Sequence, residues 1–371
     1  MTDLMTIPFF SPVAVNSAPG IRDAIQRVIE SGWYILGREV ASFETEFAAY
    51  NDVAHCVSVA SGSDALELAL RAVGVTAGAK VVTVANAGFY GSIAIYALEG
   101  TPLYVDVDDT SLTMSAVALE AALAVRPAAV IVTHLYGQMA DMPVLSALCR
   151  KAGVPLIEDC AQAHGAAMAE RKAGSWGDMA CFSFYPTKNM GALGDAGAIV
   201  TSDDALAARL RALRQYGWSQ KYTVAIPRGR NSRMDELQAA VLRVKLLQLD
   251  EHNGLRQRIA AKYNQGFLGL PLRCPALGEH YVGHLYVVRT SRRDALHEHL
   301  QAHGIGCDIH YPVADHMQPV HMRSEESLVV TQAACQEVLS LPCYPGLSDE
   351  AIDRVIYEVR RFFIGEKGCM C

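Results

Sequence analysis

The segment "CFSFYPTKNMGALGDAGA" (181–198) places a lysine, Lys188, between an apolar run and a glycine-rich turn. A lysine at the end of a strand is commonly solvated, so one interpretation is an ordinary surface residue. The other is a desolvated amine, whose lowered pKa would make it a nucleophile toward a carbonyl group and a starting point for Schiff-base chemistry. The glycines between Gly191 and Gly197 allow another group to approach the backbone closely.

Two further positions could hold a phosphate. "VASGSDALELAL" (59–70) carries Gly62, Ser63 and Asp64 where a strand meets a helix, and the free amide groups and the helix dipole at such a junction favour a phosphate. A serine there can equally be an ordinary helix cap. Ser183 lies two residues before Tyr185 and offers a second hydroxyl on the same face of its strand.

Two adjacent acids end another apolar strand. In "VPLIEDCAQAHGA" (154–166) these are Glu158 and Asp159, which point to opposite sides if the strand continues through them. At most one of the two carboxylates can therefore face a ligand cleft. A strand-end acid that only caps the backbone is the alternative.

The elements that position these groups follow from the apolar pattern. The strand-like runs are "HCVSV" (55–59), "KVVTV" (80–84), "PLYVDV" (102–107), "AAVIVTH" (128–134) and "VPLIED" (154–159). They alternate with helical patterns and are almost continuously apolar, as strands covered on both faces must be. The sequence therefore predicts an α/β fold with a mostly parallel sheet between two layers of helices. Ligands of such sheets bind beyond the carboxyl ends of the strands.

The alternation of strand-like and helical runs ends at about residue 245. A long helical stretch (235–267) leads into a mixed region that holds most of the histidines. We therefore expect a large domain over residues 1–245 and a smaller C-terminal α+β domain over residues 246–371.

Composition restricts the class of protein. The chain has 371 residues, of which 51% are hydrophobic, and this is ample for sizeable cores. A net charge of -7 argues against nucleic acid or an anionic membrane as the main partner and favours small-molecule ligands. The ten cysteines are scattered through a chain too long to need disulfides, so we expect them to be reduced.

One stretch, Val81 to Leu98, is long and uncharged enough to suggest a membrane span. Asn86, Gly88 and Ser92 interrupt it, so we expect a short buried strand, a turn and a buried helix instead. The N-terminus carries Asp3 and lacks the basic and apolar regions of a secretory signal. The sequence thus predicts a cytoplasmic protein.

Together these groups match the requirements of pyridoxal phosphate. An amine at Lys188 could bind its aldehyde, a carboxylate at Asp159 could pair with its pyridinium nitrogen, and Ser63 and Ser183 could hold its phosphate. Each feature is common alone, and the set is specific.

The sequence resembles the DegT/DnrJ/EryC1/StrS family of fold type I aminotransferases, which act on nucleotide-linked keto-sugars with pyridoxal 5'-phosphate and pass through its pyridoxamine form. The resemblance runs almost end to end. The segments that carry it are "SGWYILGREVASFETEFAAY" (31–50), "ASGSDALELAL" (60–70), "YVDVD" (104–108), "IEDCAQAHGA" (157–166), "FSFYPTKNMGALGDAGA" (182–198), "GRNSRMDELQAAVLRVKL" (229–246), "HYP" (310–312) and "LSLPCYPGLS" (339–348).

The resemblance implies roles for the matching residues. Lys188 would be the Schiff-base lysine and the base that moves a proton between the cofactor and the sugar carbon. Asp159 would keep the ring nitrogen protonated, and Gln162 would contact the ring or its 3-hydroxyl. The phosphate would be held by four residues, the last from the neighbouring subunit of a homodimer with shared active sites: Gly62, Ser63, Ser183 and Asn231.

The sequence departs from the family at one position. Many members place an aromatic side chain over the cofactor ring just after the strand near residue 83, and an ungapped match puts Gly88 there. Phe89 or Tyr90 would have to take over this position. We expect Phe89 to do so.

The resemblance is greatest to the 3-aminotransferases of the family, which act on dTDP-3-keto-6-deoxyhexoses, and the 4-aminotransferases are the alternative. Glutamate is the amino donor that the family implies. Cations suited to a pyrophosphate are Lys221, Arg228 and Arg230, although each could be part of a solvated loop. The residues that could orient the hexose are Tyr34, Tyr185, His310 and Tyr311.

Other functions are less consistent with these residues. Relatives that use the cofactor for dehydration carry histidine in place of the lysine, and Lys188 argues against that branch. A non-catalytic regulator that kept the fold is a further alternative, against which Lys188, Asp159 and Gln162 argue together. His299 and His303 stand one helical turn apart, but neither a cysteine nor an acid completes a tetrahedral set in the sequence, so no metal site is predicted.

Overall fold

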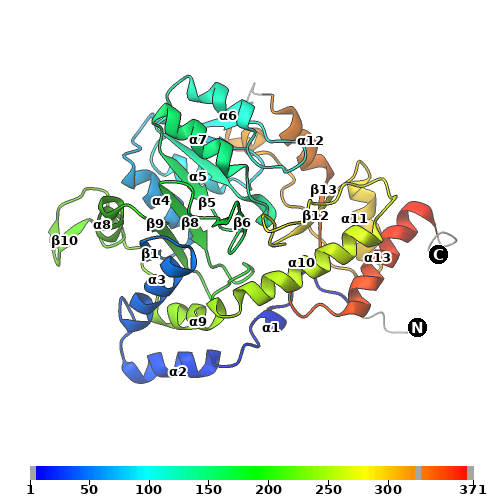
Figure 1. Ribbon diagram of the computed structural model, residues 1–371, viewed down its shortest axis with the longest axis horizontal. Coiled ribbons are helices and arrows are strands. Elements are labelled where there is room, and N and C mark those ends of the chain that lie inside the picture. The colour runs from blue at the N-terminus through cyan, green and yellow to red at the C-terminus, as the bar shows by residue number, and fades with distance from the viewer. Residues whose placement is uncertain (1–5, 322–326, 366–371) are drawn as a thin grey trace.

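A computed structural model of the chain describes residues 6–321 and 327–365 (Figure 1). The helices are α1 (Pro12–Val15), α2 (Ile21–Ser31), α3 (Arg38–Tyr50), α4 (Gly62–Ala72), α5 (Tyr90–Tyr96), α6 (Ala116–Leu123), α7 (Met142–Ala152), α8 (Asp204–Leu213), α9 (Glu236–Leu246), α10 (Leu249–Gly266), α11 (Arg293–Ala302), α12 (Val329–Glu337) and α13 (Asp349–Ile364). Short 3-10 turns are η1 (Leu135–Gly137), η2 (Asp315–Met317) and η3 (Pro319–His321).

The central sheet has seven strands in the order β1-β9-β8-β5-β4-β2-β3. These strands are β1 (His55–Val59), β2 (Lys80–Val84), β3 (Thr101–Val105), β4 (Ala129–Thr133), β5 (Leu156–Asp159), β8 (Met179–Ser183) and β9 (Gly197–Thr201). Only β9 runs antiparallel to its two neighbours. The predicted α/β class and mostly parallel sheet are confirmed. Three short pairs complete the described strands: β6 (Ala167–Met168) with β7 (Arg171–Lys172), β10 (Trp218–Gln220) with β11 (Thr223–Val224), and β12 (Tyr286–Arg289) with β13 (Val338–Leu341).

Both faces of the sheet are buried, which explains why its strands are apolar throughout. Alternate residues of β8 enter different cores: Ala180 and Phe182 pack on the side of α3, α6, α7 and α9. Met179 and Cys181 pack on the side of α4, α5 and α8. The result is a helix–sheet–helix sandwich of three layers.

The strand register brings the polar ends of several strands to one edge of the sheet. Asp159 of β5 lies beside Thr133 of β4, and Ser183 of β8 lies beside Gly197 of β9. Gly197 in turn lies beside Val59 of β1, after which the chain enters α4. Segments spread over more than a hundred residues therefore meet where a ligand of an α/β sheet binds.

A second apolar core lies in the C-terminal part of the chain. It is built from α10, α11, α13 and the β12–β13 pair, and Ile7 from the N-terminal segment packs into it. In Figure 1, α10 runs from the end of α9 toward α11 and α13, and so connects the two cores. We propose that the smaller domain begins near residue 246 and includes this N-terminal contribution.

Two expectations about individual segments differ in outcome. The stretch Val81 to Leu98 forms most of β2, a turn and the helix α5, as predicted, although α5 is buried on one face only and exposes Tyr90, Ile93 and Tyr96 on the other. Within the described residues, no helix combines the length and the apolar character that crossing a membrane requires. The predicted single helical stretch over 235–267 is instead two helices, because α9 ends at Leu246 and α10 starts at Leu249.

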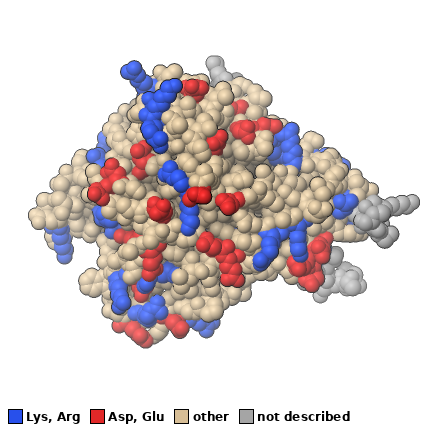
Figure 2. Space-filling model, viewed as in Figure 1, with Lys and Arg blue, Asp and Glu red and all other residues tan. Residues whose placement is uncertain are grey.

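The surface carries charges of both signs. On the face shown in Figure 2, basic and acidic side chains are interspersed, as expected for a chain with 32 Lys and Arg and 39 Asp and Glu residues. Within the described part of the chain, eight cysteines are unpaired, and seven of them are buried.

Candidate active site

Lys188 follows β8 and projects from a tight turn. Its backbone N–H donates to the carbonyl of Tyr185 at 2.8 Å, and Ala192 donates back to Phe184 at 2.7 Å, which closes the loop that carries the lysine. Gly191 is required in this loop, since a Cβ atom there would lie 2.4 Å from the carbonyl oxygen of Pro186. Burial lowers the pKa of Lys188 to about 8, and the nearby Asp159 carboxylate opposes this shift. A substantial fraction of the amine is therefore neutral at physiological pH.

The two adjacent acids point to opposite sides of β5, as strand alternation predicts. Asp159 lines a cavity together with Lys188 and accepts a hydrogen bond from the N–H of Ala161 at 3.1 Å. Burial raises the pKa of Asp159, and the positive charge of Lys188 and the Ala161 N–H limit that rise. Of the two carboxylates, that of Asp159 can interact with a ligand of the cavity.

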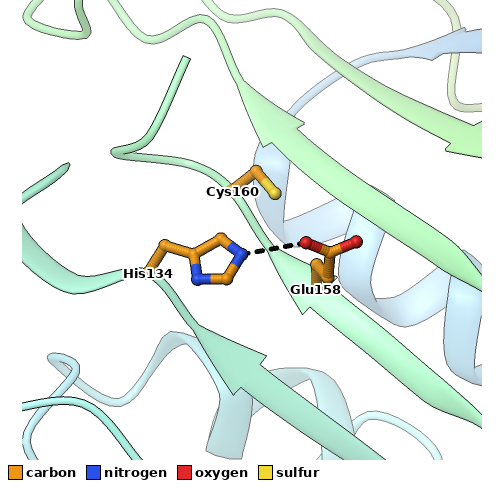
Figure 3. A group of neighbouring side chains, drawn as sticks. All are labelled: His134, Glu158 and Cys160. Atoms are coloured by element: carbon orange, nitrogen blue, oxygen red, sulfur yellow. Dashed lines mark hydrogen bonds and ion pairs between the residues drawn. The ribbon is translucent and has the colours of Figure 1, made fainter. Parts of the chain in front are cut away.

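The carboxylate of Glu158 makes its hydrogen bonds away from this cavity. It accepts backbone hydrogen bonds from Gly174, Trp176 and Gly177 at 2.8–3.0 Å. Figure 3 shows the His134 ring directing Nε2 at the same carboxylate, with a distance of 3.0 Å. Since Ala140 N–H donates to Nδ1 of His134, the ring proton lies on Nε2 and is donated to Glu158.

The hydrogen bonds to Glu158 favour the charged form of its carboxyl group. Burial alone would raise the pKa of Glu158, but the hydrogen bond from His134 and those from the backbone hold it below its usual value. Cys160 lies beside this pair (Figure 3). The four donors already occupy the carboxylate, so the group anchors the 174–177 loop to β5 rather than facing the cavity.

The cavity that contains Asp159 and Lys188 measures about 410 Å³. Its walls come from the strand ends and the start of α4, and are Ser61, Gly62, Ser63, Leu66, Ala87, Tyr90, Thr133, Leu135, Asp159, Ala161, Gln162, Ser183, Tyr185, Lys188 and Asp195. Gly62 is needed at the start of α4, because a Cβ atom there would lie 2.6 Å from Cβ of Ser183. The start of α4 with its hydroxyls, together with Ser183, thus supplies a cradle of hydrogen-bond donors for a phosphate in the same cavity as the lysine and the carboxylate.

These donors fit pyridoxal phosphate. The cradle offers amides and hydroxyls for the phosphate, Asp159 offers an anion for the ring nitrogen, and Lys188 offers an amine of lowered pKa. Gln162 is held between the two parts of the protein: its Oε1 accepts from Tyr136 N–H at 2.6 Å and its Nε2 donates to the hydroxyl of Tyr311 at 3.2 Å.

Tyr90 and Tyr185 are the aromatic residues that line this cavity, and Phe89 is not among its lining residues. Phe89 adopts a left-handed backbone conformation with φ of 71°, and its ring lies 6.0 Å from that of Tyr96. Tyr90 lines the cavity and also faces the ring of Tyr311 at 6.3 Å. The structure therefore does not place Phe89 at the cavity as expected, because the turn at Gly88 and Phe89 brings the next side chain, Tyr90, to the cavity wall.

A second cavity of about 340 Å³ shares a wall with the first. Lys188, Gln162, Tyr90 and Tyr185 border both cavities. The rest of its lining comes from the N-terminal segment and the smaller core: Phe9, Phe10, Thr187, Arg256, His284, Leu285, Asp308, His310, Tyr311, Leu341 and Cys343. Of the predicted sugar-binding residues, Tyr185, His310 and Tyr311 are thus beside the lysine.

Several predicted residues lie outside both cavities of this chain. Tyr34 is exposed, and Lys221 and Arg228 lie on or next to the β10–β11 ribbon at the edge of the molecule (Figure 1). Arg230 forms ion pairs with Asp64 and Glu67. Asn231 is exposed and bridges to Gln215 of the same chain.

No metal site was expected at His299 and His303 because no acid was expected beside them, and this reason is wrong. An acid does accompany His299 and His303: the Glu358 carboxylate of α13 lies 3.2 Å from Nε2 of His299 and 3.9 Å from Nε2 of His303. Arg361 lies 3.6 Å from the same carboxylate and 3.4 Å from His303 Nε2. The guanidinium adds a positive charge beside these two histidines and their acid, which would oppose the binding of a metal ion.

Three residues at or next to the two cavities were not predicted from the sequence. Thr133 borders the first cavity and Arg256 borders the second. Tyr136 donates its hydroxyl to the carbonyl of His310, and so connects η1 to the loop before η2. The position of Thr133 at the end of an apolar strand was a usable signal, whereas nothing local marks the other two.

Comparison with known proteins agrees with this geometry. The model of the DegT/DnrJ/EryC1/StrS aminotransferase family matches residues 17–360. A dTDP-3-amino-3,4,6-trideoxy-alpha-D-glucose transaminase of Streptomyces venezuelae is 44% identical over 345 residues, covering 91% of each chain.

Two solved structures are similar along nearly the whole chain. DesV of S. venezuelae has a TM-score of 0.93 and 43% identity, and the match covers 96% of this chain and 98% of that one. NtdA of Bacillus subtilis, solved with its cofactor PMP bound, has a TM-score of 0.92 and 28% identity, with 97% and 86% covered.

Proposed function

This chain belongs to the DegT/DnrJ/EryC1/StrS aminotransferase family, and we propose that it transfers an amino group from glutamate to the 3-keto group of a dTDP-3-keto-6-deoxyhexose. The family uses pyridoxal phosphate, and the chain is an aminotransferase of that type. The observation that carries the proposal is the position of Lys188, an amine of lowered pKa at the wall between two cavities, with Asp159 on one side.

We assign the following roles. Bound in the first cavity, pyridoxal phosphate supplies an electron sink that stabilises negative charge at the substrate carbon. The neutral amine of Lys188 binds the cofactor and, when free, moves a proton to and from that carbon. The Asp159 carboxylate keeps a proton on the ring nitrogen, which preserves the electron sink. Ser63, Ser183 and the amides at the start of α4 hold the phosphate.

The remaining contacts orient the two rings. Tyr90 lines the first cavity and would pack against the cofactor ring, and Gln162, which is fixed at the same cavity by its bonds to Tyr136 and Tyr311, would contact that ring. Tyr185, His310 and Tyr311 border the second cavity and are positioned to contact the sugar. Such positioning decides which carbonyl reaches the reacting atoms.

We propose that the enzyme is a homodimer whose active sites are shared. Asn231, Lys221 and Arg228 carry groups suited to phosphates but lie outside the cavities of their own chain. The nearby ribbon exposes 77% of Tyr222 and 62% of Val224, which favours a partner on this side.

The compartment is a separate proposal. The unpaired cysteines of the described residues support a reducing, cytoplasmic compartment.

The test uses enzyme loaded with pyridoxal phosphate and supplied with glutamate. Separate reactions contain a 3-keto and a 4-keto dTDP-6-deoxyhexose, and NMR locates the new amine. We expect amination at C3. The nearest alternative is a 4-keto-sugar aminotransferase, and an amine found only at C4 would support it and contradict the assigned position.

A further inference from the structure

Three arginines are buried in the described part of the chain: Arg214, Arg256 and Arg289. Arg214 forms an ion pair with Glu44, and Arg289 pairs with Asp109 at 2.8 Å and with Glu337 at 2.9 Å. Arg256 is the most deeply buried of the three, at 2% exposure, and among the described residues no carboxylate lies within 4.0 Å of it. Its charge is therefore uncompensated by an acid.

The hydrogen bonds of Arg256 are also incomplete. It extends from α10, and Nη1 donates to the backbone carbonyl of Cys343. Its Nε is buried and has no hydrogen-bond partner. An arginine has five N–H donors, and a buried cation without an anionic partner is destabilising, so a ligand that carries a negative charge would complete this site.

Arg256 borders the same 340 Å³ cavity as Lys188. The other charged or titratable groups of its lining do not compensate it. Asp308 has a side chain 65% exposed and lies 3.9 Å from His310. Burial lowers the pKa values of His284 and His310, so both rings favour the neutral form. The cavity thus combines a reactive amine with an unpaired buried cation, and its volume lies within the range of roughly 300–1,000 Å³ that is typical of ligand pockets.

We propose that Arg256 binds a carboxylate of the amino donor in the cavity beside Lys188. The inference rests on the proposed transamination and names the site for one of its two substrates. A carboxylate matches the planar fork of a guanidinium and would supply both the missing charge and the missing hydrogen bonds. The amino-sugar product carries no carboxylate, and the groups proposed above for its pyrophosphate, Lys221 and Arg228, lie outside this cavity, so Arg256 is expected to serve the donor half-reaction alone.

Measuring the two half-reactions separately distinguishes a role of Arg256 in donor binding from a purely structural role. The donor half-reaction is followed in the wild-type holoenzyme and in Arg256→Met by the change in cofactor absorbance on mixing with glutamate. The sugar half-reaction is followed in reverse, on mixing with the aminated dTDP-sugar. We expect kcat/KM for glutamate to fall on the order of 100-fold in the variant, the size typical of removing one member of a buried charged pair. The value for the amino sugar should change by less than about threefold.

A matched control is Arg214→Met, which removes a buried arginine that already has an acidic partner. Any effect of this variant should be similar in the two half-reactions, as expected for a loss of packing. Equal losses in both half-reactions for Arg256→Met, or no loss in either, would overturn the assignment. A wild-type enzyme that accepts the amino sugar but never glutamate or another amino acid would overturn the donor proposal as well.

Comparing glutamate with L-alanine identifies the carboxylate. If Arg256→Met loses both donors to the same degree, the α-carboxylate is the ligand; if it loses glutamate only, the side-chain carboxylate is. A second measurement does not depend on the folding of a variant: a crystal structure of the wild-type holoenzyme soaked with succinate should place a carboxylate on the guanidinium of Arg256. Succinate bound elsewhere in the cavity, with Arg256 still unpaired, would contradict the proposal.

Discussion

The carboxylate of Asp315 accepts a hydrogen bond from the hydroxyl of Ser92, with 2.7 Å between the two oxygens. Its other oxygen accepts from the backbone N–H of Phe89 at 2.9 Å. One acid in η2 therefore fastens the start of α5 and the turn that directs Tyr90 into the cofactor cavity. Burial raises the pKa of Asp315 to about 7, although the two hydrogen bonds oppose this shift.

Asp315 should make stability depend on pH. Its pKa rises from 3.8 in the unfolded chain to about 7 in the fold, so the folded state binds more protons between these values. The stabilising contribution of protonated Asp315 is thus complete below pH 4 and is lost as the pH rises through 7. Asp315→Asn, which resembles the protonated acid, should lack this loss. Thermal melts of both proteins from pH 5 to 8 would check this, and parallel curves would contradict it.

Lys188→Ala should lose transamination by at least about 10³-fold, because it removes both the attachment point for the cofactor and the base. Activity with glutamate and the keto-sugar, measured with saturating cofactor, would show this. Lys188→Arg is the matched control: it retains the positive charge, yet it cannot supply a neutral amine and should be as inactive. Turnover by Lys188→Ala at the wild-type rate would rule out the assigned role.

Asp159→Asn should bind cofactor but transfer the proton about 10²- to 10⁴-fold more slowly, since a neutral amide cannot hold the ring nitrogen in its charged form. Glu158→Gln is the control on the same strand. It should lower the free energy of unfolding by about 1–3 kcal/mol, because a buried carboxylate loses hydrogen-bond partners, while sparing the rate per folded molecule. Single-turnover rates and denaturant unfolding separate the two effects, and the reverse pattern would exchange the roles.

Mixing two inactive variants should restore activity if the active sites are shared. In heterodimers of Lys188→Ala with Asn231→Ala, one of the two sites would receive both intact residues, and at most half of the wild-type activity per dimer is expected. Subunit exchange is verified by mass-tagged chains. Exchange without any gain in activity would show that each site is built from one chain.

Local pattern in the sequence predicted that Lys188 and Asp159 would line the same cavity. Lys188 and Asp159 stand at the ends of apolar strands, and strand ends of a parallel sheet converge on one edge, so their proximity follows from the fold class. Strand alternation likewise required that Glu158 and Asp159 separate. The backbone geometry of short elements is encoded within a few residues, and these features depend on little else.

Other features depend on partners far apart in the chain. The choice of Tyr90 over Phe89 depends on a turn that Asp315 fastens from more than two hundred residues away. Glu358 joins His299 only because α13 packs against α11. In the sequence, Arg256 cannot be distinguished from an exposed arginine of an amphipathic helix. Whether it has an acidic partner depends on which segments pack against it. Pairing and burial are properties of the packed chain, so only the tertiary structure decided them.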